Sequence, residues 1–288
     1  MKIEQHLLLE GLSLVDFSTR LPGPLASSYL KDLGAKIYRP EETFNSDPFD
    51  HHPDIAFNYW FNKLSEGKEV LKGELEEIIK TCDGIIITWT QSKQFSKLFK
   101  AIDKPFVILE IQASKNIKKK SLHDLNSIAE SGLLKLQINN EHATPPCIPI
   151  AGVQFGNQIA LNFLSGILKS KQLQRPIKIE IALDEVVEQL TNYLLPPSGQ
   201  LFLHNGKFPC YQIYPTQKPK QYLIVAAIET KFWLEFITFL NLNELKEMQF
   251  SEDAKVFSKI KEHIASMAQD QLEKMCHDHK CLSLITTD

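Results

Sequence analysis

The side chain in this sequence best suited to chemistry is His123, in the segment Ser121-Leu122-His123-Asp124-Leu125-Asn126. It stands between a lysine-rich stretch, residues 115–120, and an apolar run with helical spacing. An imidazole has an unperturbed pKa near neutrality, so it is able both to take and to return a proton. The alternative is a helix start with a solvated His-Asp pair. This segment alone leaves both interpretations open.

The N-terminal segment predicts the elements that would position such a residue. Residues 12–17 form a short apolar run typical of a buried parallel strand. Pro22-Gly23-Pro24 marks a turn, and residues 25–33 have helical spacing that ends at Gly34. Residues 35–39 are a second strand candidate. The order strand, turn, helix and strand predicts a βαβ unit.

The same alternation continues along the chain. Further helices are expected at 71–80 and 93–99, with strands at 83–88 and 105–110. This pattern predicts an α/β protein with an open, mostly parallel sheet. Ligands of such sheets bind at the carboxyl ends of the strands.

The second half of the sequence adds further elements and a domain boundary. A helix is expected at 157–169 and a strand at 178–183, which leads into a helix through Leu195. Pro196-Pro197-Ser198-Gly199 then marks a break, so we expect a large domain at 1–198 and a small one at 199–288. Within the latter we expect a strand at 222–227, a helix at 231–240 and two further helical stretches.

The composition excludes several classes of protein. The 288 residues are 43% hydrophobic and 23% charged, which is typical of a globular protein. A net charge of -3 argues against binding to nucleic acid or to a membrane surface. No apolar run is long enough to span a bilayer, and the N-terminus makes a poor signal peptide. Five scattered cysteines do not indicate a disulfide framework, so we expect a cytoplasmic protein.

Four blocks of the sequence resemble the family III CoA transferases (the CaiB/BaiF type), and among them most closely the α-methylacyl-CoA racemases. The first block comprises Leu9-Glu10-Gly11, Asp16-Phe17-Ser18, Pro22-Gly23-Pro24, Leu30-Lys31-Asp32-Leu33-Gly34-Ala35 and Arg39-Pro40-Glu41. The second block is the His123 segment, and the third is residues 177–195. The fourth runs from Pro209-Cys210-Tyr211 to Lys231-Phe232-Trp233.

This resemblance implies a Rossmann-like large domain, a small α/β domain, a homodimer of interlocked chains and an acyl-CoA thioester as ligand. A racemase removes the proton α to the thioester carbonyl and returns one on the other face. By resemblance, His123 is one proton carrier and Glu229 matches a glutamate that orients it. A carboxylate on an imidazole fixes its tautomer and stabilises its charged form. The alternative for Glu229 is a charge that favours the start of a helix.

The sequence departs from the family where the second catalytic group is expected. Racemases carry an aspartate shortly before the central helix, and transferases place their acyl-accepting aspartate in the same region. Residues 149–158 contain no carboxylate, and either Gln154 or Phe155 stands in its place. An amide is neither a useful base nor a nucleophile for forming an anhydride. Because one acid/base group contributes about 10² to 10⁴ in rate, we expect racemisation to be impaired and covalent CoA transfer to be lost.

The resemblance also points to residues that would bind CoA. Arg39 would meet a phosphate, Lys68 and Lys93 would supply further positive charge, and Asp124 would contact the cofactor portion. The alternatives are a solvated arginine at a strand end for Arg39 and, for Asp124 and Asn126, capping of the helix that follows. Two arginines of the family pattern are missing, from Ser65-Glu66-Gly67-Lys68 and Trp89-Thr90-Gln91-Ser92.

Near the C-terminus, Cys276-His277-Asp278-His279-Lys280-Cys281 places four potential zinc ligands in six residues. Structural zinc sites usually draw on separated pairs, so we expect no metal site and no cofactor beyond CoA itself. The sequence ends soon after Cys281, whereas family members return to the large domain. We therefore expect the interlocked ring to be incomplete.

Two hypotheses follow. The first is an acyl-CoA enzyme resembling α-methylacyl-CoA racemase, working from His123 and Glu229 with an atypical or absent second base. The second is a non-catalytic derivative that binds CoA esters or acts as a structural partner. A CoA transferase is a third and weaker possibility, because the aspartate nucleophile is missing.

Overall fold

The computed structural model describes residues 7–71, 75–115, 122–136, 145–195 and 206–287. The chain divides into two compact units, Met1–Leu194 and Leu195–Asp288. The expected domain boundary, between residues 198 and 199, lies outside the described residues and stays a prediction.

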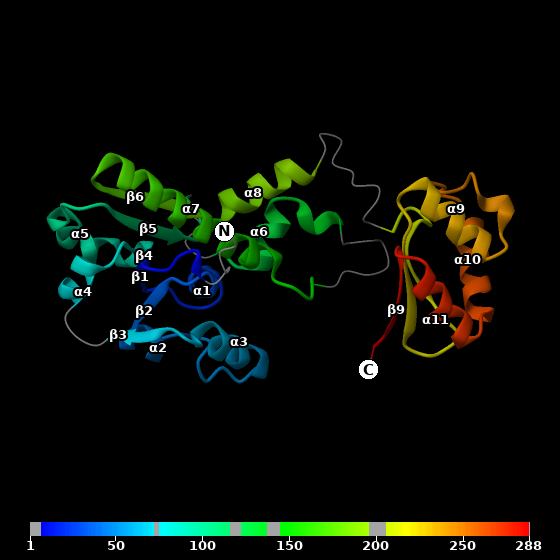
Figure 1. Ribbon diagram of the computed structural model, residues 1–288, viewed down its shortest axis with the longest axis horizontal. Coiled ribbons are helices and arrows are strands. Elements are labelled where there is room, and N and C mark those ends of the chain that lie inside the picture. The colour runs from blue at the N-terminus through cyan, green and yellow to red at the C-terminus, as the bar shows by residue number, and fades with distance from the viewer. Residues whose placement is uncertain (1–6, 72–74, 116–121, 137–144, 196–205, 288) are drawn as a thin grey trace. The chain divides into compact units, whose positions relative to one another are not determined.

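The first unit is built on a parallel sheet, as the sequence predicts, and the sheet has six strands (Figure 1). The order of strands across the sheet is β3-β2-β1-β4-β5-β6. The order therefore reverses between β1 and β4, and in open α/β sheets ligands bind outside the carboxyl ends of the strands at such a switch point. The strands are β1 (Ser13–Asp16), β2 (Lys36–Pro40), β3 (Glu69–Leu71), β4 (Gly84–Thr88), β5 (Phe106–Gln112) and β6 (Pro176–Ala182).

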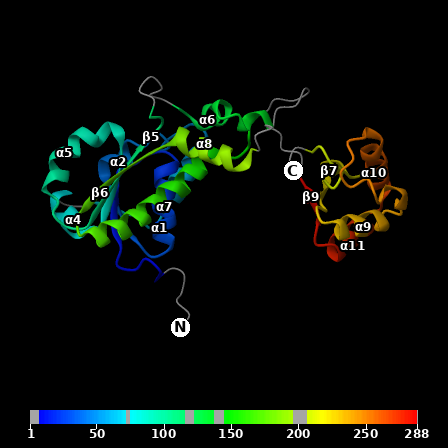
Figure 2. The same cartoon turned by 90° about the horizontal axis from the view of Figure 1, so that it is seen from above.

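Helices cover both faces of this sheet, since its strands carry apolar side chains on both sides (Figure 2). On one face, Leu14 and Ile86 contribute to a core that includes residues of α1, α6, α7 and α8. On the other, Val15, Ile85 and Ile87 pack with residues of α4 and α5. The helices are α1 (Pro22–Asp32), α4 (Leu75–Thr81), α5 (Ser92–Ala101), α6 (Asp124–Glu130), α7 (Ile150–Leu173) and α8 (Leu183–Leu194).

The expected strands and most expected helices of this unit are confirmed, with three differences. Strand β3, which ends at Leu71, was not expected, and the helix expected from that residue begins only at Leu75. The central helix α7 is longer than the apolar run that predicted it. Two helices were not expected, α2 (Glu41–Asn45) and α3 (Ile55–Ser65), the latter capped by Asp54, whose Oδ1 accepts a hydrogen bond of 2.8 Å from the Ala56 backbone N–H.

The second unit contains a three-stranded antiparallel sheet, β7 (Tyr211–Pro215), β8 (Gln221–Ala226) and β9 (Leu282–Thr286), with β8 in the middle. Its core is made by residues of this unit alone and centres on Trp233, whose indole N–H donates to the Lys246 carbonyl at 2.9 Å. The expected strand and helices are present. Its helices are α9 (Thr230–Phe239), α10 (Ala254–Ser266) and α11 (Gln269–Asp278).

Among the described residues, every helix is too short or too polar to cross a bilayer.

Candidate functional site

Three chain segments meet at the carboxyl edge of the parallel sheet, and Gly152 marks the place. A Cβ atom on Gly152 would lie 3.2 Å from Leu21 Cδ2 and 3.6 Å from Asp124 Oδ1. A Cβ atom on Gly156, one turn further along α7, would lie 3.0 Å from the Pro22 carbonyl oxygen. The loop after β1, the start of α6 and the start of α7 are therefore in contact, next to the switch point of the sheet.

His123 occupies the N-cap position of α6. Its backbone is extended, its carbonyl accepts from the Ser127 N–H at 3.0 Å, and the residue is exposed. The side chain itself makes no capping hydrogen bond. The ring is therefore accessible and stands at the meeting point of the three segments.

Asp124 holds this arrangement together. Its Oδ1 accepts a hydrogen bond of 2.7 Å from the Gly152 backbone N–H, in the first turn of α7. Burial raises the pKa of this carboxyl, and the backbone N–H groups of Gly152 and Ala151 oppose that rise. We expected Asp124 to cap α6, the helix that follows it, and this expectation is wrong. Asp124 lies within the first turn of α6, and its side chain caps α7 instead. Asn126 is exposed on α6.

Gln154 and Phe155, the two residues that stand where the family carries an aspartate, differ in burial. Phe155 is 4% exposed and belongs to the core between α7 and the sheet. Gln154 is half-buried in the same helix. Of the two positions, Gln154 is therefore the one that keeps access to the surface.

Arg39 lies inside the protein rather than in solvent. Its side chain is 1% exposed and pairs with Asp47, with 3.2 Å between Nη2 and Oδ2. Nη2 also donates to the Ser18 carbonyl at 2.9 Å, and the guanidinium lies over the Phe44 ring. The alternative of a solvated arginine is therefore wrong. Its role in binding a CoA phosphate stays a prediction that requires a ligand to compete with Asp47.

Lys68 is equally enclosed. Its ammonium group donates to the Pro24 carbonyl and to Ser27 Oγ, both at 2.7 Å, and lies 3.8 Å from Asp16 Oδ2. Asp16 in turn accepts from the hydroxyl groups of Ser18 and Ser27. Burial lowers the pKa of Lys68 to about 7, although the Asp16 carboxylate opposes that shift. A contact between Lys68 and CoA stays a prediction, and these internal partners would have to give way to it.

Lys93 is exposed in the first turn of α5, shortly after the carboxyl end of β4. Trp89, in the 3₁₀ turn between them, is 43% exposed. A contact between Lys93 and CoA stays a prediction.

Glu229 lies in the second unit, where it is the N-cap residue of α9. Its carbonyl accepts from the N–H groups of Phe232 (2.9 Å) and Trp233 (3.1 Å), while its exposed side chain makes no capping bond. This is the geometry expected for a charge at a helix start. Since His123 belongs to the first unit, the pairing of the two side chains stays a prediction.

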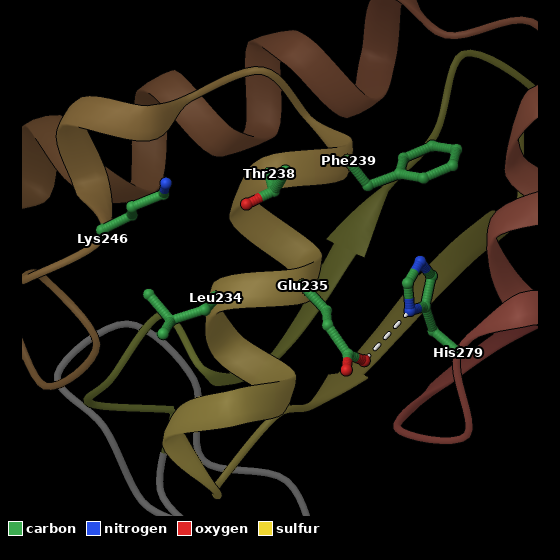
Figure 3. A pocket seen from close by; sticks show the side chains of 6 residues that line it. All are labelled: Leu234, Glu235, Thr238, Phe239, Lys246 and His279. Carbon is green, nitrogen blue, oxygen red and sulfur yellow. Dashed lines mark hydrogen bonds and ion pairs between the residues drawn. The ribbon is translucent and has the colours of Figure 1, made fainter.

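The cysteine- and histidine-rich segment at the end of α11 does not converge on one point. His277 pairs with Asp278 at 3.0 Å, whereas His279 Nδ1 lies 3.4 Å from Glu235 Oε2 (Figure 3). The described residues contain no group of three or more potential metal ligands. His279 and Glu235 instead line an open depression of about 450 Å³ beside Phe239.

Sequence reasoning missed the buried network of Asp16, Ser27 and Asp47 and the exposed Arg20 in the loop after β1. The link from Asp47 to the Arg20 N–H spans 27 positions, and no local pattern marks it. Arg20 did carry a signal: it is a charged residue directly after the first strand, at the edge where ligands bind.

The architecture has close counterparts among solved structures. The hypothetical protein Rv3272 from Mycobacterium tuberculosis superimposes with a TM-score of 0.73 at 18% identity, over 97% of this chain and 84% of that one. A CaiB/BaiF family protein from Brucella suis gives 0.73 at 17% identity, also over 97% and 84%. No family model and no curated protein matches the sequence. The chain therefore has the fold of the CaiB/BaiF proteins, the family III CoA transferases.

Proposed function

We propose that the protein acts on an acyl-CoA thioester and exchanges the proton α to its carbonyl, with His123 as the proton carrier. The observation that carries the proposal is the convergence at Gly152, where the exposed His123 turn meets the loop after β1 at the switch point. The CaiB/BaiF fold supports CoA esters as the ligand class.

The chemistry asked of His123 is a proton transfer. The neutral imidazole takes the α-proton, which leaves an enolate and an imidazolium, and the imidazolium then returns a proton to the same carbon. Its proton exchanges with water in between. We include Glu229 in the proposal as the carboxylate that stabilises the imidazolium.

The second acid/base group is absent from the place where the family carries it. Gln154, the accessible residue there, has an amide that does not exchange protons usefully near neutral pH. A single proton carrier favours exchange of the α-proton with solvent over efficient inversion. The same absence leaves no nucleophile for covalent CoA transfer.

A second candidate is a protein that binds CoA esters without acting on them. Two observations favour it: no carboxylate lies in residues 149–158, and Phe155 is part of the core. This candidate shares the ligand with the first and differs only in the chemistry.

Deuterium exchange separates the two candidates. The protein is incubated with a 2-methylacyl-CoA in D₂O, and loss of the α-proton is followed by NMR for the wild type, His123→Ala and the control Asn126→Ala. Asn126 is an exposed neighbour on the same helix. We expect exchange that His123→Ala reduces by about 10² to 10⁴ and Asn126→Ala leaves intact.

Calorimetric titration with CoA completes the test. Binding without exchange would favour the non-catalytic candidate. Absence of CoA binding would overturn both, because both require this ligand. Thermal unfolding of each variant shows whether a loss of exchange reflects a loss of folding.

A further inference from the structure

We propose that Arg20 binds a carboxylate on the acyl portion of the ligand, so that the site selects CoA thioesters of dicarboxylic acids. The inference rests on the proposed function, since it takes a CoA thioester as the ligand. Arg20 lies in the loop between β1 and α1, at the carboxyl end of a strand beside the switch point.

The backbone of Arg20 is held in an unusual state. Its φ of 67° lies in the left-handed region, which residues other than glycine rarely adopt. The Arg20 N–H donates to both carboxylate oxygens of Asp47, at 3.1 and 3.2 Å. Asp47 is 4% exposed and is itself anchored by Arg39. The buried ion pair of Asp47 with Arg39 thus holds the backbone of Arg20 in this conformation.

The Asp47 carboxylate does not neutralise the side chain that it positions. Its oxygens are occupied by the Arg39 guanidinium and by the backbone N–H groups of Arg20 and Phe49. The Arg20 side chain is exposed, and no carboxylate of the described residues forms an ion pair with its guanidinium. Within the part of the chain that the structure describes, the loop therefore presents a guanidinium group that no carboxylate neutralises.

Leu21, the residue after Arg20, places Arg20 near the segment that carries His123. Leu21 Cδ2 approaches Gly152 from one side, and Asp124 Oδ1 approaches it from the other. Arg20 and His123 therefore each lie one residue away from this contact. In a CoA thioester the long pantetheine arm separates the phosphates from the acyl carbon, so an anion here belongs to the acyl group. A guanidinium matches a carboxylate with two parallel hydrogen bonds.

The test compares glutaryl-CoA with pentanoyl-CoA, two thioesters that differ only in a terminal carboxylate against a methyl group. Each is titrated calorimetrically, alongside free CoA, into the full-length wild type, Arg20→Gly, Arg20→Gln and Arg175→Gln. Glycine accepts the left-handed backbone, so Arg20→Gly removes the guanidinium without straining the loop. Arg175 is an exposed arginine at the opposite edge of the sheet, where β6 begins, and serves as the matched control.

We expect the wild type and Arg175→Gln to bind glutaryl-CoA about 10- to 100-fold more tightly than pentanoyl-CoA. Both Arg20 variants should lose this preference while keeping their affinity for pentanoyl-CoA. Equal binding of the two thioesters by the wild type would overturn the inference and leave the proposed function standing. Weaker binding of free CoA by Arg20→Gly would also overturn it, by assigning Arg20 to a phosphate. Absence of binding to any of the three ligands would overturn the proposed function and this inference together.

Discussion

Two buried ion pairs position the loop that follows β1, at the carboxyl edge of the sheet. Two ion pairs, Arg39 with Asp47 and Lys68 with Asp16, lie beneath the loop that presents Arg20. A buried pair is weak evidence for stability, because desolvation offsets much of the attraction between the charges. Here the pairs orient backbone: Asp47 holds the Arg20 N–H, and Lys68 holds the Pro24 carbonyl. We therefore assign them a positioning role in the loop.

The lowered pKa of Lys68 predicts how the free energy of unfolding depends on pH. The folded protein releases the Lys68 proton near pH 7, whereas the unfolded chain keeps it until its ordinary value of 10.5. Between these values the unfolded state binds more protons, so the free energy of unfolding should rise with pH, by at most about 1.4 kcal/mol per pH unit. The measurement is urea unfolding of the wild type and Lys68→Met at pH 7 and 9.5, with Lys36→Met as an exposed control.

Comparison between variants is needed because other buried groups act in the opposite direction. Burial raises the pKa of Cys210 to about 11, which makes high pH unfavourable for the folded state. That contribution is common to all three proteins and cancels in the differences. Identical pH slopes for wild type and Lys68→Met would show that Lys68 keeps its ordinary pKa when folded.

Close approaches between elements set the geometry of the sheet. Gly84, the first residue of β4, allows the Val107 carbonyl oxygen and the Phe163 ring of α7 to approach its Cα. A Cβ atom there would lie 2.6 Å from that oxygen and 2.8 Å from the ring. Gly166 of α7 is also close to its neighbours, but its nearest contact, at 2.7 Å, is the flexible end of Ile179. The two glycines therefore have different tolerance for a side chain.

This difference gives a prediction for two alanine substitutions. Gly84→Ala should lower the free energy of unfolding by about 1–3 kcal/mol, because backbone and an aromatic ring have to move. Gly166→Ala should cost less, since Ile179 is able to rotate and alanine favours a helix by about 1 kcal/mol over glycine. Urea unfolding of both variants decides the order. Equal or reversed costs would mean that α7 is free to shift on the sheet.

The whole molecule is a pair of units with separate cores. Every residue of the core around Trp233 comes from the second unit, and the two cores on the faces of the parallel sheet come from the first. Each unit thus has an apolar core of its own. The interlocked homodimer stays a prediction.

The independence of the second core predicts that residues 206–288 fold alone. The isolated segment should show dispersed amide signals by NMR and a cooperative thermal transition. Trp233→Ala should remove about 3–5 kcal/mol and abolish that transition, since the ring is fully buried and its N–H is hydrogen-bonded. A spectrum without dispersion for the unmodified segment would show that this unit depends on the first.

The amino-acid sequence by itself determined the alternation of strands and helices and the parallel sheet, and it singled out the His123 turn. Apolar periodicity and turn residues are local properties, so they can be read without knowing what packs where. Only the tertiary structure decided that Arg39 and Lys68 are enclosed, that Phe155 and not Gln154 joins the core, and that Asp124 caps α7. Burial and partner choice depend on residues distant in the chain: Asp124 and Gly152 are 28 positions apart, and Lys68 and Pro24 are 44. Local patterns carry no record of such contacts, because these form when the elements pack.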